Sequence, residues 1–105
     1  LLIVPASLLG NWGRECIKFT PDLDFTIRHG KEAKKKDFPF LTIVTYQGAS
    51  TSAAIQEEKW DIVILDEAQN IKNRNTKQTK VIKALYRKQS IAMTVTPIEN
   101  SLMNL

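Results

Sequence analysis

Apolar residues in this chain form short continuous runs, and longer segments of mixed polarity separate them. The runs lie at residues 2–4, 41–45, 62–65 and 91–93. A continuous run rich in β-branched residues is typical of a strand that is covered on both faces, as in a parallel sheet. Residues 24–28 alternate between polar and apolar side chains and predict one further, shorter strand.

The segments between the runs predict helices. Residues 7–19 form the first, with Ser7 as its N-terminal cap and Pro21 just beyond its end. Residues 46–58 predict a weaker helix, and residues 76–88 carry a clear apolar stripe. Strands that alternate with helices of this length imply right-handed crossovers and a parallel sheet, so the sequence predicts the α/β class.

The composition narrows the setting of the protein. With 105 residues, of which 43% are hydrophobic, the chain can form one modest core. Its formal charge of +4 favours a polyanionic partner. A single cysteine, Cys16, excludes an internal disulfide and favours an intracellular location, cytoplasmic in a bacterium or nuclear in a eukaryote. Because no apolar run approaches about 18 residues, we expect no membrane partner.

Two adjacent carboxylates, Asp66 and Glu67, directly follow the run at residues 62–65. In open α/β folds, ligands bind beyond the carboxyl ends of the strands. Carboxylates buried there need water, a cation or a metal as a partner. Phosphate chemistry uses such a pair, one acid to hold Mg²⁺ and the other to take a proton from water. The alternative is that Asp66 only caps a following helix and Glu67 is its exposed neighbour.

Polar groups also follow the first and the last apolar run. Thr94 and Thr96 place two hydroxyls after the run at residues 91–93, just before a proline that cannot continue a ladder. The run at residues 2–4 leads through a proline into a helix, whose free amides would form an anion site that suits a nucleic-acid phosphate. Trp12, within this helix, is expected to serve core packing.

Taken in order, residues 2–12, 66–69 and 94–97 resemble motifs Ia, II (Walker B) and III of the Swi/Snf-type ATPases of helicase superfamily two. Proteins of this family are DNA-dependent motors with two RecA-like lobes. The resemblance covers essentially the whole chain and implies that residues 1–105 are a fragment of the first lobe. The implied fold is a partial RecA-like three-layer domain, with a mostly parallel sheet flanked by helices.

The resemblance implies ATP and Mg²⁺ as cofactors and assigns roles to the residues at the strand ends. Asp66 would hold Mg²⁺ through water, and Glu67 would act as the general base on the attacking water. Gln69, Thr94 and Thr96 would couple the state of the nucleotide to the grip on DNA.

The implied partners are double-stranded DNA and the second RecA-like lobe of the same parent chain. By their position in motif Ia, the residues that would contact DNA are Ser7, Leu8 and Asn11. The lysine-rich stretch at residues 31–36 is either a solvated loop or a patch that faces DNA.

Three features depart from the family pattern. None of the four glycines is followed by Lys and then Ser or Thr, so this sequence contains no P-loop and we interpret it as an excerpt that is inactive alone. Gln69 stands where the family usually has histidine, and Val95 stands where motif III usually has glycine. A β-branched residue adopts a positive φ only at a cost, so either no such φ is needed or Val95 impairs coupling of ATP to DNA.

Two other functions stay open. Another superfamily-two motor, such as a restriction translocase or an RNA helicase, is disfavoured by the tails at residues 71–73 and 97–100. A non-catalytic DNA-binding or interaction module with a degenerate ATPase fold would explain Val95 and the missing P-loop. The strand order of the family also predicts that residues 91–94 form an uncovered sheet edge, through which copies of the fragment would associate.

Overall fold

The computed structural model describes residues 1–28, 37–71 and 76–94 of the chain. Strands and helices alternate along these ranges. The strands are β1 (Leu2–Val4), β2 (Phe25–Arg28), β3 (Leu41–Thr45), β4 (Trp60–Leu65) and β5 (Arg87–Ala92). The α-helices are α1 (Leu9–Phe19), α2 (Tyr46–Thr51), α3 (Ala53–Glu57) and α4 (Lys77–Ala84). The 3-10 turns η1 (Ala6–Leu8) and η3 (Ala68–Ile71) precede α1 and follow β4.

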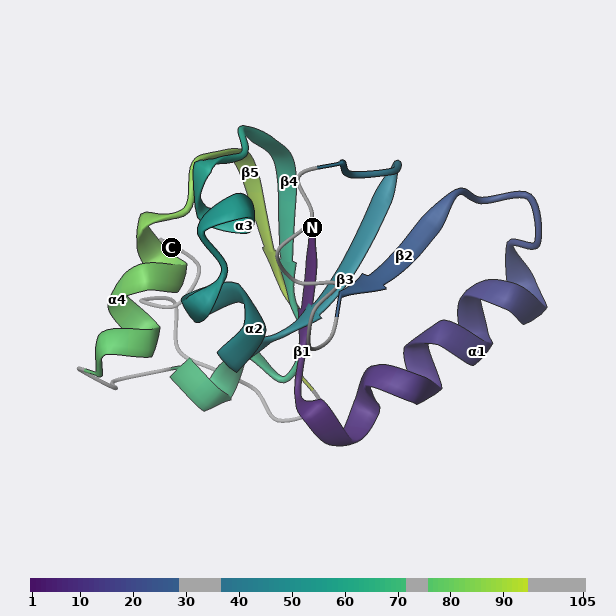
Figure 1. The fold of residues 1–105 in the computed structure, drawn as a ribbon. Coiled ribbons are helices and arrows are strands. Elements are labelled where there is room, and N and C mark those ends of the chain that lie inside the picture. Colours follow the sequence, from purple (N-terminus) through teal and green to yellow (C-terminus); the bar gives the residue numbers. More distant parts are fainter. Residues whose placement is uncertain (29–36, 72–75, 95–105) are drawn as a thin grey trace.

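The described strands form one sheet in the order β2-β3-β1-β4-β5, and each of its pairings is parallel. The predicted α/β class and parallel sheet are therefore confirmed. β1 lies at the centre, where Leu2 pairs with Ile43 of β3 and with Ile64 of β4. Because the strands are parallel, their carboxyl ends meet at one edge, which is the lower side of the sheet in Figure 1.

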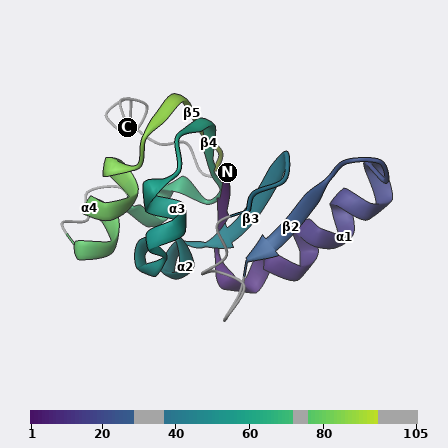
Figure 2. The ribbon, with the colours of Figure 1, turned by 45° about the horizontal axis from the view of Figure 1, so that its top comes forward.

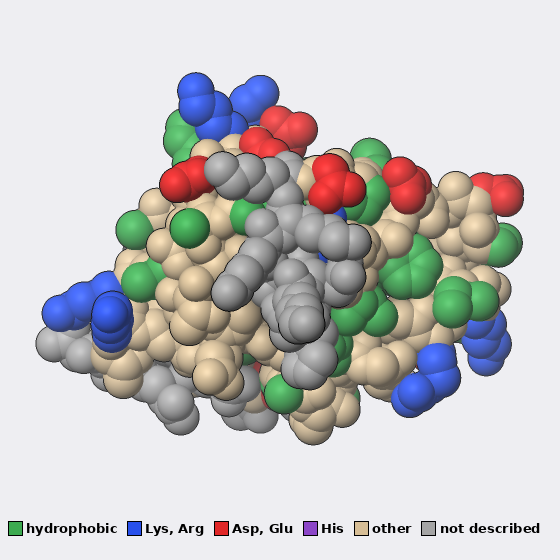
Figure 3. All heavy atoms as spheres, in the orientation of Figure 1, with side chains coloured by type: hydrophobic (Ala, Val, Ile, Leu, Met, Phe, Trp, Pro, Cys, Tyr) green, Lys and Arg blue, Asp and Glu red, His purple; other side chains and the backbone are tan. Residues whose placement is uncertain are grey.

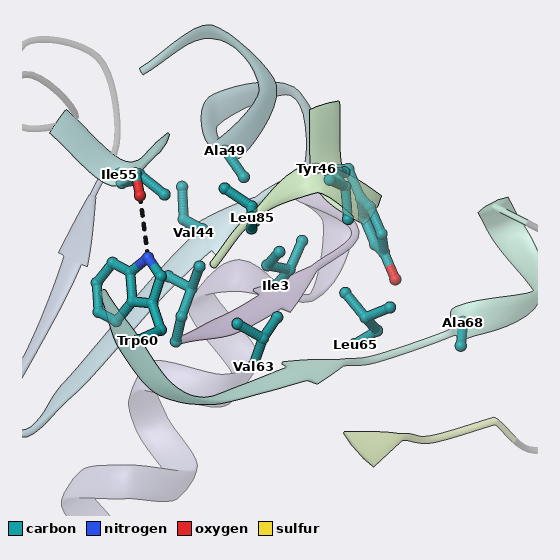
Figure 4. Close-up of a cluster of buried hydrophobic side chains, with 12 residues drawn as sticks. Ile3, Val44, Tyr46, Ala49, Ile55, Trp60, Val63, Leu65, Ala68 and Leu85 are labelled. Atoms are coloured by element: carbon teal, nitrogen blue, oxygen red, sulfur yellow. Dashed lines mark hydrogen bonds between the residues drawn. The ribbon is translucent and has the colours of Figure 1, made fainter. Parts of the chain in front are cut away.

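Helices cover both faces of the sheet and complete the predicted three layers. Figures 1 and 2 show α1 on one face and α2, α3 and α4 on the other. The larger core lies beneath the second group, and Figure 4 shows the Trp60 indole there, donating a hydrogen bond of 3.0 Å to the Ile55 carbonyl. The buried members of this core are Leu1, Ile3, Val44, Tyr46, Ala49, Ile55, Trp60, Val63, Leu65, Ala68, Ile82 and Leu85.

The core beneath α1 is smaller and tightly packed. Gly13 lies so close to β2 that a Cβ atom there would be 2.7 Å from Cδ1 of Ile27. Cys16 is buried in this layer, and burial, together with the nearby Glu15, raises the pKa of its thiol. The buried centre of this layer consists of Leu2, Val4, Cys16 and Ile43.

Residues 62–65 are less completely covered than their apolar run predicts. Val63 and Leu65, on the side of the larger core, are fully buried, but Ile62 is 38% exposed. In β5, Ile91 pairs with Ile64 and is 45% exposed. Because α1 packs chiefly against β2 and β3, this face of β4 and β5 is only partly covered in the described structure, where Ile64 and Met93 pack against the smaller core. The prediction of a strand covered on both faces was therefore wrong for this end of the sheet.

The last predicted helix ends earlier than its sequence suggests. α4 stops at Ala84, whereas the apolar stripe and basic residues predicted a helix up to residue 88. Arg87 turns back instead and donates to the carbonyls of Ile82 at 3.2 Å and Lys83 at 2.5 Å. A cationic donor satisfies the open carbonyls of a last helical turn, so Arg87 closes α4 and starts β5.

Two other predicted helices also differ. The segment at residues 46–58 divides at Ser52, whose Oγ accepts the Ile55 N–H at 3.3 Å and caps α3. The predicted cap at Ser7 was wrong, because Ser7 lies exposed inside η1 and α1 begins only at Leu9. No side chain caps the start of either η1 or α1.

The outermost of the described strands on the β4 side is β5, so the predicted sheet edge is present. This edge begins at Arg87, earlier than the predicted residues 91–94. The first half of β5 is charged, and the exposed Lys88 there has its Nζ 3.5 Å from Oδ1 of Asp61. The second half carries the exposed Ile91. Association of copies through β5 stays a prediction. No helix in the described ranges is long and apolar enough to cross a membrane.

Candidate functional site

The turn that carries Asp66 and Glu67 lies at the carboxyl edge of the sheet, directly after β4. Backbone hydrogen bonds tie it to both neighbouring strands. The Asp66 N–H donates to the Ile3 carbonyl at 2.8 Å, and the Ala68 N–H donates to the Met93 carbonyl at 2.9 Å. The ends of β1, β4 and β5 therefore hold the two acids in a fixed place.

Asp66 is held by groups from three different parts of the chain. Its Oδ2 accepts the indole N–H of Trp12 at 2.8 Å, and its Oδ1 accepts the N–H of Glu67 at 3.0 Å. Its carbonyl oxygen accepts the hydroxyl of Tyr46 at 2.6 Å. The residue is only 9% exposed and borders a hollow of about 570 Å³ that runs along α1.

Tyr46 is the first residue of α2 and is buried in the larger core. Burial raises the pKa of its hydroxyl, and the negative charges of Asp66 and Glu67 raise it further. The hydroxyl therefore keeps its proton near neutral pH and donates to the backbone of the acid turn. In this way α2 fixes the position of the turn without using either carboxylate oxygen of Asp66.

Glu67 has a φ of 53°, in the left-handed region that a residue with a Cβ enters only at a cost. Its carboxylate accepts a hydrogen bond of 2.5 Å from the side-chain amide of Gln69. The amide oxygen of Gln69 in turn accepts the hydroxyl of Thr94. This chain of hydrogen bonds joins the acid turn to the end of β5.

The strain at Glu67 gives a first prediction. Glu67→Gly should leave the protein more stable than Glu67→Ala by about 1 kcal/mol, because glycine has no Cβ to oppose the left-handed conformation. Urea unfolding of the two variants measures this difference. The matched pair Lys80→Gly and Lys80→Ala, inside α4, should give the opposite order by about 1 kcal/mol. The same order at both positions would contradict the strain at Glu67.

The predicted DNA contacts lie close to the acid turn. Leu8, which is half-buried, and Asn11, which is exposed, border the same hollow as Asp66, and Ser7 is exposed in the preceding turn. The structure thus brings the start of α1 and the acid turn to the same edge of the sheet. Thr96, Val95 and the lysine-rich stretch at residues 31–36 lie outside the described residues.

Sequence reasoning missed two residues of this site. Trp12 does pack on the smaller core, as expected, but it also donates a hydrogen bond to Asp66. Tyr46 was noted only as the start of a weak helix. Its place directly after β3, at the edge where the acids also lie, was the available signal.

The carboxylate of Asp66 is compatible with a hydrated cation such as Mg²⁺. No group of three or more His, Cys, Asp or Glu side chains gathers into a metal site in the described parts of the chain. Mg²⁺ commonly keeps several waters and takes one or two carboxylates, with substrate phosphates as its other ligands. Each carboxylate oxygen of Asp66 accepts one protein donor and retains a further lone pair for such a hydrated ion.

Comparison with known proteins places this geometry in a family. The SNF2-related domain matches residues 1–105, the full length of the chain. The chain belongs to the SNF2-related domain family. It is 39% identical to YwqA of Bacillus subtilis, a candidate ATP-dependent helicase or translocase by its name, over 100% of this chain and 12% of that protein. It is 30% identical to the ISWI chromatin-remodeling complex ATPase ISW2 of Saccharomyces cerevisiae, over 100% of this chain and 10% of that protein.

A solved structure of this family has the same fold. The SWI2/SNF2 ATPase core of Sulfolobus solfataricus, determined in complex with double-stranded DNA, superposes with a TM-score of 0.87 and 39% identity. The match covers 98% of this chain and 24% of the archaeal chain. The RecA-like lobe of a Snf2-type ATPase, which the resemblance implied, is thereby confirmed as the fold. This chain spans about a tenth of the length of the two relatives named above.

Proposed function

We propose that this chain forms part of the first RecA-like lobe of an ATP-dependent motor that acts on double-stranded DNA. The observation that carries the proposal is the acid turn, fixed at the carboxyl edge and linked through Gln69 to Thr94. The match to the SNF2-related domain over the whole chain supports it. The names of the relatives support the use of ATP, and the archaeal complex supports DNA as the partner.

Asp66 and Glu67 divide the work in this proposal. Asp66, buried and oriented by two donors, would hold Mg²⁺ through water. Glu67 is half-buried, and its side chain would accept a proton from the water that attacks the terminal phosphate. Bound Mg²⁺ would neutralise charge on the phosphates of ATP.

Gln69 and Thr94 would report the state of the nucleotide. Because the Gln69 amide donates to Glu67 and its oxygen accepts from Thr94, a shift of the Glu67 carboxylate changes both hydrogen bonds. Thr94 follows β5, so the change reaches the strand end that leads to Thr96. In the proposal, Gln69, Thr94 and Thr96 couple ATP hydrolysis to the binding of DNA.

The DNA side of the proposal rests on the start of α1. Ser7, Leu8 and Asn11 would contact one strand of the duplex, and the second RecA-like lobe would complete the binding groove. Figure 3 shows lysine and arginine side chains of the described residues over α1, over α4 and at the top of the molecule. Contacts from η1 and α1 to the phosphates would set the position of the duplex.

Asn11→Ala in the intact protein tests the proposed function. ATP hydrolysis by the intact protein should rise on addition of double-stranded DNA, and Asn11→Ala should weaken the apparent DNA affinity about fivefold, as expected for one lost hydrogen bond of about 1 kcal/mol. Gln47→Ala, an exposed position on α2 at the opposite face, serves as the control and should behave like the parent. If double-stranded DNA did not change the rate of ATP hydrolysis by the intact protein, the proposed function would be refuted.

A further inference from the structure

The indole of Trp12 connects helix α1 to the acid turn. Its Nε1–H donates to Oδ2 of Asp66 at 2.8 Å, although 54 positions separate the two residues in the chain. Trp12 is half-buried and, like Leu9, packs on the smaller core. Packing on the sheet and the hydrogen bond together fix the indole on both sides.

The hydrogen-bond donors around Asp66 hold different groups of this residue. The Glu67 N–H at Oδ1 belongs to the same turn, so it moves with the acid, and Tyr46 holds only the backbone carbonyl. Of these two donors to the Asp66 carboxylate, Trp12 is the one from a separate element of the fold. The indole therefore sets the orientation of the carboxylate relative to α1 and to the hollow that both residues border.

We infer that Trp12 is a positioning residue, which aims the Asp66 carboxylate at Mg²⁺ and ties that aim to the position of α1. The inference rests on the proposed function, because it needs Asp66 as the residue that holds the metal. Asn11, a proposed DNA contact, directly precedes Trp12 in the same helix. A movement of α1 on binding DNA would carry the indole with it and reorient the carboxylate.

The chain contains a matched control for this role. Trp60 also donates an indole hydrogen bond, at 3.0 Å to the Ile55 carbonyl, and it is buried in the larger core away from the acids. Trp12→Phe and Trp60→Phe therefore remove the same kind of donor from two packed sites. Only the first removes a donor from a carboxylate that would hold the metal.

The test measures Mg²⁺-dependent nucleotide binding by the intact protein, with a fluorescent ATP analogue and without turnover. Trp12→Phe should raise the Mg²⁺ concentration for half-maximal binding about tenfold, the lower end of the range for losing a partner that orients a residue of a metal site. Trp60→Phe should leave this concentration unchanged, although both variants lose thermal stability. In hydrolysis assays, Trp12→Phe should also reduce the stimulation by double-stranded DNA.

An isosteric replacement protects the test against misfolding. 3-Benzothienylalanine in place of Trp12 keeps the shape of the ring system but has sulfur where the indole has N–H, and it should reproduce the tenfold change. In an Asp66→Ala background, replacement of Trp12 should have no further effect on the Mg²⁺ dependence, because the partner is gone.

The possible results distinguish a failure of the positioning role of Trp12 from a failure of the proposed function. If Asp66→Ala weakens Mg²⁺-dependent binding but Trp12→Phe and the benzothienyl variant match Trp60→Phe, the positioning role of Trp12 is refuted and the proposed function stands. If Asp66→Ala itself leaves Mg²⁺-dependent binding unchanged, both are refuted. A tenfold change that the Asp66→Ala background abolishes supports the inference.

Discussion

Glu67→Gln in the intact protein should reduce DNA-stimulated ATP hydrolysis about a hundredfold or more, because a positioned general base contributes at least that much. The amide that replaces the carboxylate can still accept the hydrogen bond from Gln69, so the link to Thr94 keeps its geometry. Asp66 is untouched, and binding of ATP with Mg²⁺ should therefore stay near the parental affinity. Steady-state hydrolysis and equilibrium nucleotide binding, measured on the same preparation, check both halves of the prediction.

Glu57→Gln provides the control for this experiment. Glu57 is exposed at the end of α3, and its neutralisation changes the net charge equally without touching the acid turn. It should hydrolyse ATP at the parental rate. Hydrolysis at the parental rate in Glu67→Gln would instead exclude Glu67 as the base, and some other group would have to accept the proton.

The 105-residue chain on its own should show no detectable DNA-stimulated ATP hydrolysis. Its sequence contains no Gly-Lys-Ser/Thr to hold the phosphates. The resemblance to the Swi/Snf-type ATPases implies that the second lobe of the intact protein supplies arginine residues. Positioning and charge stabilisation are each worth orders of magnitude in phosphoryl transfer, so the acid turn cannot replace them. Release of phosphate from ATP, followed over hours with and without duplex DNA, is the measurement.

Contaminating ATPases are the main risk in that measurement, and Glu67→Gln in the same chain controls for them. Turnover that survives repeated purification and disappears in Glu67→Gln would show that these residues suffice for catalysis. It would also mean that the phosphates are held by groups that sequence reasoning did not identify.

Most of the strands could be predicted from the sequence because their signal is local, but the polar first half of β5 could not. The run at residues 41–45 coincides with β3, and the acids at 66 and 67 do follow a strand. The end of α4 could not be predicted, because Arg87 closes that helix by a contact with carbonyls that its own sequence pattern does not reveal. The bonds from Trp12 and Tyr46 to Asp66 likewise cross 54 and 20 positions, and the spacing of residues carries no signal for them.

The division of β5 into a charged and an apolar half limits how copies of this chain could aggregate. When two copies pair their β5 edges about a twofold axis, the two β5 strands run antiparallel. The residue at the centre of the contact then lies opposite the same residue of the other copy. A contact centred on Lys88 would place two positive charges opposite each other. A contact centred on Ile91 would instead leave the basic start of each β5 strand outside the hydrogen-bonded pairing. Only the short C-terminal end of β5, which lies beside the acid turn, could then pair with a second copy. Any other segment or chain that covers this end of β5 would therefore also protect the protein from forming fibres.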